Sequence, residues 1–241
     1  MTEKLSVEPR FLSIEENYKE IVDRIGEAAI KSGRRPEDIR FMAVTKTVEP
    51  VFINHALSLG IDLIGENKVQ ELLGKTELLV PADVEKHLIG HLQTNKVRKI
   101  VDTVSMIQSV DSGTLLTEIQ RQAEKHEKTI DILIELNVGG EEAKTGLPVE
   151  SLGELLACLP DCPNVRLRGL MAVPPICEDP LETRRYFSHM RRLFEDLRAK
   201  PVPGAKIDTL SLGMSSDYVE AILEGSTLVR IGSALFGMRR Y

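Results

Sequence analysis

Short apolar runs alternate with amphipathic helical patterns along almost the whole chain. Eight of the runs are nearly continuous in apolar character, as expected for strands that are covered on both faces. These predicted strands are Ile39–Lys46, Asp62–Glu66, Lys86–Gly90, Val104–Val110, Ile130–Val138, Leu167–Val173, Ile207–Leu212 and Leu228–Ile231. Such an alternation favours right-handed crossovers and a parallel sheet.

Helical patterns occupy the segments between these strands. They are Pro50–Leu59, Lys68–Leu79, Thr94–Asp102, Gly113–Lys125, Val149–Leu159, Leu181–Ala199 and Asp217–Glu224. Eight strands in about 200 residues fit a closed (β/α)8 TIM barrel better than an open doubly wound sheet, which has fewer strands. We therefore predict an α/β barrel. We also predict a single domain over residues 1–241, because no linker, repeat or low-complexity tract divides the chain.

A further helix is predicted before the first strand, from Ser13 to Ser32. Ser13 and Glu16 have the spacing of a capping box, and Gly33 supplies a stop signal. This helix would cover part of the outside or the floor of the barrel.

The composition excludes several classes of function. The net charge of −6 provides no basic face for nucleic acid. No apolar run reaches the roughly 18 residues needed to cross a bilayer, and the N-terminal residues lack the apolar core of a signal peptide. We therefore expect a cytoplasmic protein without a membrane partner. Cys158, Cys162 and Cys177 are expected to be free thiols, and no histidine completes a metal-ligand spacing with them.

Lys46 is the strongest candidate for a reactive residue. In a barrel of this kind the active site lies at the C-terminal ends of the strands, and Lys46 ends the first predicted strand. Burial lowers the pKa of an ammonium group, and only the neutral amine attacks an aldehyde to form a Schiff base. The alternative is a lysine that reaches solvent or a carboxylate. Lys144 is the competing lysine, although it lies in a polar loop where its ammonium would be solvated.

Two serine-rich segments follow the last two predicted strands. Ser215 and Ser216 come after the seventh strand, and Gly232 and Ser233 come after the eighth. The loops after strands seven and eight form the recurrent phosphate site of this fold. The alternative is ordinary turn and helix-capping chemistry. Together with Lys46, the two segments favour an aldehyde that carries a phosphate.

Three further polar residues are expected at the same end of the barrel. Arg230 lies within the last strand, where a permanently charged guanidinium needs a partner. That partner is either the pyridine nitrogen of a cofactor or a buried carboxylate such as Glu66. Asn67 contacts a ring hydroxyl or caps the helix that follows it, and His91 lies against the ring or bonds to the backbone.

These residues carry a resemblance to the pyridoxal phosphate homeostasis protein family, also described as the proline synthetase co-transcribed homologue family. The resemblance runs in order from about Ile39 to Gly237. It rests on the segments Ala-Val-Thr-Lys, Gly-Glu-Asn-Lys-Val-Gln-Glu, His-Leu-Ile-Gly-His-Leu-Gln-Thr-Asn-Lys, Gly-Leu-Met-Ala-Val, Leu-Ser-Leu-Gly-Met-Ser-Ser-Asp and Val-Arg-Ile-Gly-Ser-Ala-Leu-Phe-Gly.

The resemblance implies a fold-type III barrel similar to the N-terminal domain of alanine racemase. It also implies a bound pyridoxal 5′-phosphate, with a Schiff base on Lys46, a ring-nitrogen contact from Arg230, and phosphate contacts from Ser215, Gly232 and Ser233, with Ser216 adjacent. The family is regarded as regulating intracellular pyridoxal phosphate without an established catalytic turnover. The implied partners are the cofactor itself and apo-enzymes that receive it.

Two other functions use the same residues. One is an amino-acid racemase or decarboxylase that depends on pyridoxal phosphate, and the other is a cofactor-free Schiff-base aldolase. A racemase needs a base on each face of the α-carbon, and related enzymes take one from a tyrosine of a second domain or a partner chain. Here Tyr18, Tyr186 and Tyr218 lie on predicted helices, and no second domain is expected after the last strand. We therefore expect a monomeric cofactor-binding protein rather than an enzyme.

Overall fold

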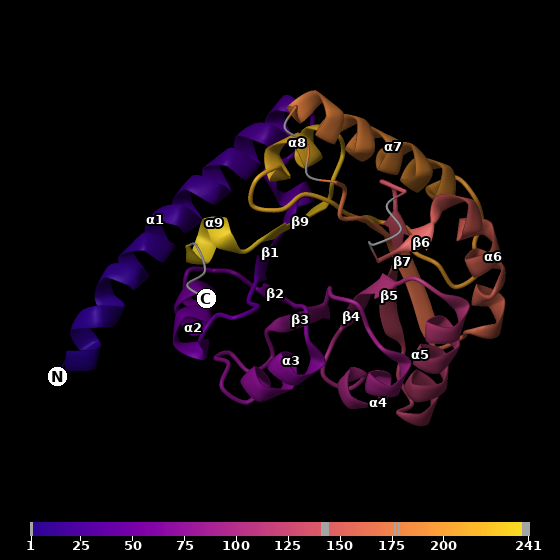
Figure 1. Cartoon of the computed structure of the whole chain (residues 1–241), viewed down its shortest axis with the longest axis horizontal. Helices are drawn as coiled ribbons and strands as arrows, with labels where there is room; N and C mark the ends of the chain where they lie inside the picture. The colour runs from indigo at the N-terminus through magenta and orange to yellow at the C-terminus, as the bar shows by residue number, and fades with distance from the viewer. Residues whose placement is uncertain (1, 141–144, 176, 178, 238–241) are drawn as a thin grey trace.

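Eight parallel strands form a closed barrel (Figure 1). The computed structural model describes residues 2–140, 145–175, 177 and 179–237. The strands are ordered β4-β3-β2-β1-β9-β8-β7-β5, and pairing between β4 and β5 closes the ring. They are β1 (Arg40–Val44), β2 (Leu63–Glu66), β3 (Glu85–Leu88), β4 (Met106–Val110), β5 (Ile130–Asn137), β7 (Val165–Met171), β8 (Thr209–Ser211) and β9 (Leu228–Ile231). The predicted barrel is therefore confirmed.

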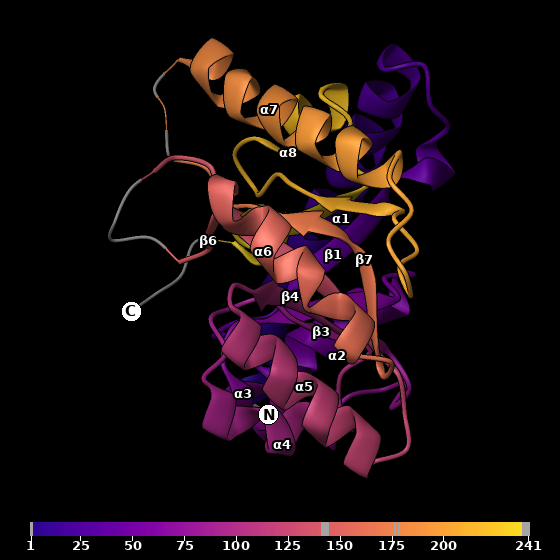
Figure 2. The same cartoon turned by 90° about the vertical axis from the view of Figure 1, so that its right-hand side faces the viewer.

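Helices cover the outside of the barrel. They are α1 (Thr2–Lys31), α2 (Pro50–Ser58), α3 (Val69–Thr76), α4 (Val97–Ile100), α5 (Gly113–Lys125), α6 (Leu152–Ala157), α7 (Pro180–Arg198), α8 (Tyr218–Leu223) and α9 (Ser233–Phe236). Figure 1 shows α1 running along one side of the molecule past α8 and α9 to α2, and Figure 2 shows α5, α6 and α7 on another side. Within the described ranges, none of these helices has the length and apolar composition of a membrane span.

The first helix begins earlier than the sequence predicted. It starts at Thr2, so the capping box at Ser13 is wrong, and Ser13 Oγ instead donates to the carbonyl of Pro9 within the helix. The reason is tertiary packing, because Phe11 stacks on His55 of α2 and extends the buried face toward the N-terminus. The predicted stop is confirmed, since Gly33 has a φ of 75° just after the last helical turn.

Other element boundaries differ by a few residues. The predicted first strand ended at Lys46, whereas β1 ends at Val44 and the chain turns through Thr47, which has a φ of 63°. Thr94–Asp102 and Val149–Leu159 each contain a 3-10 turn before a shorter α-helix. These 3-10 turns are η2 (Thr94–Lys96) and η3 (Val149–Ser151). Of the other two, η1 (Pro36–Asp38) lies outside the predicted helices, and η4 (Leu159–Asp161) begins at the last residue of one. The sequence analysis missed β6 (Leu147–Pro148), which pairs only with the end of β5, and it missed α9.

The apolar core lies mainly between the barrel and its helices. Two large clusters of buried Leu, Ile and Val fill that layer, and α1 contributes Ile14, Ile21 and Ile25 to one of them. The barrel interior holds only small apolar clusters, such as Met42 with Leu63 and Leu228. Polar side chains occupy much of the remaining interior, and they lead to the candidate site.

Candidate cofactor site

Lys46 lies in the turn that follows β1 and is half-buried. Met42 faces the barrel interior, where it packs with Leu63 and Leu228. β1 ends at Val44, so Lys46 lies just beyond its C-terminal end. The candidate lysine therefore belongs to the C-terminal mouth of the barrel, where the sequence analysis expected it.

Side chains of α3 hold this turn in place. The Thr47 amide donates to the Glu71 carboxylate. Lys75 Nζ lies 2.7 Å from the carbonyl of Thr45, 3.1 Å from Glu66 Oε2 and 2.6 Å from Glu71 Oε1. Lys75 is thus the cation that neutralises the buried carboxylate of Glu66, and sequence reasoning did not single it out.

Asn67 follows β2 directly. Its side-chain oxygen is buried and has no hydrogen-bond partner among the described residues. The helix-capping alternative is not supported, because α3 has no side-chain cap hydrogen bond at its first turn. Gly90 packs against this position, since a Cβ on Gly90 would lie 2.4 Å from the Asn67 carbonyl oxygen.

His91 lies farther out, in the loop after β3. Its side chain is 52% exposed, and Nδ1 lies 3.3 Å from Oδ2 of Asp111, which follows β4. The structure therefore places His91 at the rim of the mouth, beside a carboxylate. A contact with a bound ring stays a prediction.

The loops after β8 and β9 are joined by one serine. Ser215 Oγ accepts hydrogen bonds from the amides of Gly232, at 3.1 Å, and Ala234, at 3.2 Å. The close approach of Ser215 to the loop after β9 depends on Gly213. This glycine has a φ of 89°, and a Cβ there would lie 2.6 Å from Ala221 Cβ. Because Ser215 accepts with its oxygen, its hydroxyl hydrogen remains available to an outside acceptor.

The two neighbouring serines lie at the same mouth, and both are exposed: Ser216 in the turn before α8, and Ser233 at the first position of α9. The alternative of capping chemistry is also present, since Asp217 Oδ1 accepts the amide of Met214 at 2.6 Å. Asp217 thus closes the turn, and the hydroxyls of Ser216 and Ser233 remain exposed.

Arg230 is buried inside the barrel and donates three hydrogen bonds. Nη1 reaches the carbonyl and the hydroxyl oxygen of Ser211, at 2.7 and 2.5 Å, and Nη2 reaches the carbonyl of Ala172 at 2.8 Å. A guanidinium has five N–H donors, so these bonds leave two for a ligand. The alternative of an ion pair with Glu66 is not supported, because the direct partners of Arg230 among the described residues are Ser211 and Ala172, and Glu66 pairs with Lys75.

Carboxylates near Arg230 act on it without a direct hydrogen bond. Burial lowers the pKa of Arg230 to about 10, and the attraction of Glu135 and Asp217 opposes this shift. Burial raises the pKa of both carboxyls in turn. Glu135 Oε1 accepts from Thr145 at 2.9 Å, while Oε2 is buried without a partner among the described residues.

Sequence reasoning missed Glu135 and the interior residues Ser211, Gln108 and His87. Each is a buried polar residue of a barrel strand, and Glu135 and Gln108 lie in strands that are mainly apolar. That pattern was the available signal, for example Gln108 in Met-Ile-Gln-Ser-Val. Lys144, the competing lysine, lies outside the described residues.

Neighbouring strands bring most of the predicted residues together. Gly232 lies against Val44, since a Cβ there would be 3.3 Å from Val44 Cβ, and Lys46 follows two residues later. The order β9-β1-β2-β3 places Arg230, Lys46, Asn67 and His91 on consecutive strands or just beyond them. Among the described residues, no group of three or more His, Cys, Asp or Glu side chains is arranged to hold a metal ion.

The comparisons with known proteins cover the same residues. The family described as alanine racemase, N-terminal domain, matches residues 13–240. A pyridoxal phosphate homeostasis protein of Aquifex aeolicus is 42% identical over 226 residues, which are 94% of this chain and 98% of that protein. This chain belongs to the pyridoxal phosphate homeostasis protein family.

Solved structures agree with this membership. PipY of Synechococcus elongatus, whose structure has pyridoxal phosphate bound, is 32% identical to this chain. The match has a TM-score of 0.78 and covers 88% of this chain and 100% of PipY. Alanine racemase of Streptomyces coelicolor is 17% identical, with a TM-score of 0.69 over 95% of this chain and 59% of the racemase. The racemase match shows the shared barrel fold alone.

Proposed function

We propose that this protein binds pyridoxal 5′-phosphate as a Schiff base on Lys46 and takes part in intracellular pyridoxal phosphate homeostasis. The names of its relatives and the cofactor in PipY support this proposal. The observation that carries it is the junction of the two phosphate-type loops through Ser215, next to Arg230 and one strand away from the Lys46 turn.

The residues at the mouth fit the three polar parts of the cofactor. The hydroxyls of Ser215, Ser216 and Ser233 suit a phosphate, because they are hydrogen-bond donors that accommodate a dianion. Gly232 would contribute by holding Ser215 in place, since its amide donates to Ser215 Oγ. Among the described residues, the buried, unpartnered Oδ1 of Asn67 is an acceptor and suits the ring hydroxyl, which would donate to it.

Arg230 would face the ring nitrogen, and His91 would lie at the rim. When bound, the cofactor supplies an aldehyde that condenses with amines and a ring that withdraws electrons.

Arg230 also supports a role without turnover. A guanidinium with a pKa of about 10 keeps its protons at pH 7 and can only donate, so it would leave the ring nitrogen unprotonated. A ring in that state withdraws electrons weakly. Tyr18, Tyr186 and Tyr218 lie on α1, α7 and α8 rather than at strand ends, so none is positioned as a second base. We propose a monomeric cytoplasmic carrier that passes the cofactor to apo-enzymes.

The covalent link is tested by absorption spectroscopy with borohydride reduction and peptide mapping. We expect a yellow protein whose visible band disappears on reduction, with the label on Lys46. Lys46→Ala should abolish the band, whereas Lys68→Ala, which removes an exposed lysine at the same end, should retain it. A colourless protein, or a label that maps to Lys144, would contradict the assignment.

The absence of turnover is tested by NMR in D₂O. The holo-protein is incubated with L-alanine and other amino acids, and exchange of the α-proton is followed over time. We expect negligible exchange. Sustained exchange at catalytic rates that disappears in Lys46→Ala would replace the carrier with a racemase-like enzyme.

A further inference from the structure

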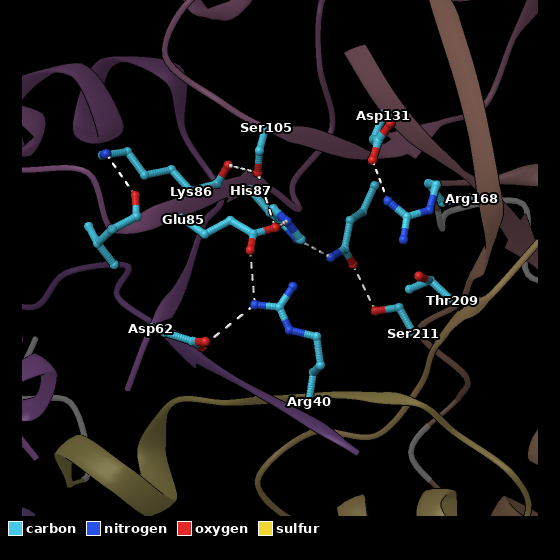
Figure 3. A network of polar contacts seen from close by, with 12 residues as sticks. Arg40, Asp62, Glu85, Lys86, His87, Ser105, Asp131, Arg168, Thr209 and Ser211 are labelled. Carbon is cyan, nitrogen blue, oxygen red and sulfur yellow. Dashed lines mark hydrogen bonds and ion pairs between the residues drawn. The ribbon is translucent and has the colours of Figure 1, made fainter. Parts of the chain in front are cut away.

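A continuous hydrogen-bonded network crosses the barrel interior, from Ser211, which contacts Arg230, to Arg40; Figure 3 shows the part from Ser211 to Arg40. Gln108 Oε1 accepts from Ser211 Oγ at 2.7 Å, and Gln108 Nε2 lies 2.9 Å from His87 Nδ1. His87 Nε2 lies 2.7 Å from Glu85 Oε1, and Glu85 Oε2 accepts from Arg40 at 2.9 Å. We call Ser211, Gln108, His87 and Glu85 the interior network. It joins Arg230 at the C-terminal side of the barrel to Arg40 at the opposite end.

The donors of this network all point the same way. Arg230 can only donate, so Ser211 Oγ accepts from it and turns its own hydrogen toward Gln108 Oε1. The amide nitrogen of Gln108 then donates to Nδ1 of His87. Nδ1 must therefore lack a hydrogen, and Nε2 carries one and donates it to Glu85.

The charges of the network agree with this direction. Burial lowers the pKa of His87, against the attraction of Glu85 and Asp131, so its imidazole is neutral at pH 7. The hydrogen bond from His87 is the largest cause that lowers the pKa of Glu85 to about 2, and Arg40 adds to it. A neutral imidazole thus donates to a carboxylate, and aligned bonds of this kind polarise one another.

Arg230 needs such an arrangement because its three direct acceptors are all uncharged. They are two carbonyls and the Ser211 hydroxyl. A Ser211 hydroxyl fixed by Gln108 always presents its lone pair to Nη1. Without Gln108 as acceptor, the Ser211 hydroxyl could rotate its hydrogen toward the guanidinium. The hydrogen bond from Nη1 of Arg230 to Ser211 Oγ would then be lost.

We propose that Gln108 and His87 are positioning residues for Arg230. They keep Nη1 of Arg230 bonded to Ser211, and the remaining N–H groups of the guanidinium then point toward the cofactor ring. This inference rests on the proposed function, since it assumes that Arg230 faces the ring. Gln108 bonds to Ser211, and His87 bonds to Gln108. Their effect passes through Ser211.

The first test uses the protein without cofactor. A long-range ¹H–¹⁵N NMR spectrum of the imidazole groups should show His87 as the neutral tautomer with its hydrogen on Nε2 between pH 6 and 8. A His87 imidazolium, or a neutral tautomer with the hydrogen on Nδ1, would reverse the donor direction and overturn the proposal. This measurement needs no variant that could fail to fold.

The second test compares two variants in the holo-protein. Gln108→Met cuts the interior network with a side chain of similar size. Lys86→Met is the matched control, because Lys86 is also a buried polar residue next to His87, but its ammonium bonds to the carbonyls of Ala82 and Val84 outside the network.

We expect Gln108→Met to release pyridoxal phosphate about tenfold faster, which corresponds to about 1.4 kcal/mol. Its visible band should change with pH between 6 and 9, where the bands of wild type and Lys86→Met stay constant. Equal spectra and release rates in the two variants would overturn the proposal while leaving the proposed function intact. A wild-type protein that forms no link to Lys46 would instead overturn the proposed function.

Discussion

Individual carboxyl groups in the barrel have opposite environments. Glu85 gains hydrogen bonds from His87 and Arg40 that outweigh its partial burial, so its pKa falls. Among the described residues Glu135 accepts one hydrogen bond, from Thr145, and burial raises its pKa despite the attraction of Arg230. The contrast predicts that the two residues affect stability in different pH ranges.

The raised pKa of Glu135 makes its charged form unfavourable in the folded state. Its contribution to stability is complete below about pH 4.5, the ordinary pKa, and is lost as the pH rises through the folded-state pKa. Glu135→Gln should therefore unfold at a higher urea concentration than wild type at pH 8 and at a similar one at pH 4. Glu124→Gln, an exposed change on α5, is the control. An equal difference at both pH values would contradict this account.

The two serines that flank the β9 turn should separate stability from binding. Ser215→Ala removes the acceptor of two amides, so it should lower stability by about 1–3 kcal/mol as well as cofactor affinity. Ser233→Ala removes an exposed hydroxyl and should lower affinity alone, by about ten- to a hundredfold for a hydrogen bond to a charged phosphate. Urea unfolding and titration of the apo-protein measure the two effects. Unchanged affinity in Ser233→Ala would remove it from the phosphate site.

Sequence reasoning singled out residues of an unusual type within or just after an apolar run, and their roles at the cofactor stay predictions. Lys46 and Arg230 are examples, since a cation in an apolar run demands an explanation. Gln108 was missed because its partner Ser211 is 103 residues away in sequence. His87 was missed because its role depends on Gln108, and Glu135 was missed among the apolar residues of β5. Pairing of Glu66 with Lys75 could not be inferred, because it depends on how α3 returns over the strand ends.

At the scale of elements, the turns after strands decide the geometry of the site. The β8–α8 turn is compact because Gly213 adopts a φ of 89° while it packs against Ala221 and Tyr218. This arrangement brings Ser215 to the amides that follow β9. The sequence predicted the strands and helices on each side of this turn, but α1 and α9 show that packing of nearby helices moves boundaries beyond what periodicity predicts.

Gly213→Ala should disturb both the turn and the site. A Cβ there would lie 2.9 Å from Tyr218 Cα, and the positive φ is strained for alanine, so we expect a loss of about 2 kcal/mol or more. Cofactor affinity should fall with it. Gly74→Ala is the control: no atom lies within 4 Å of its Cβ position in α3, and alanine should stabilise that helix by about 0.5–1 kcal/mol. Equal stability of the two variants would contradict the role of the turn.

At the scale of the whole molecule, the barrel has two chemically different ends. The C-terminal mouth carries serine hydroxyls, Asn67 and the Lys46 turn. The opposite end carries ion pairs, such as Arg168 with Asp131 and Asp208. In barrels of this kind one end serves function and the other serves stability. The interior network connects the two.

All the candidate cofactor contacts come from the strands and loops of one barrel, so no second copy is needed to complete the site. We therefore expect a monomer of 26.9 kDa in solution, with and without pyridoxal phosphate. Size-exclusion chromatography with light scattering measures this mass directly. A stable dimer that dissociates when the cofactor is removed would contradict the expectation and would indicate a shared site.

Arg230 fastens three neighbouring parts of the barrel wall, since it belongs to β9 and binds Ser211 of β8 and the carbonyl of Ala172 just after β7. A mutation at this position therefore changes the wall and the proposed ring contact in one step. A substitution of Arg230 would therefore need compensating changes in β7 and β8 to keep the wall intact, whatever it did to the proposed ring contact.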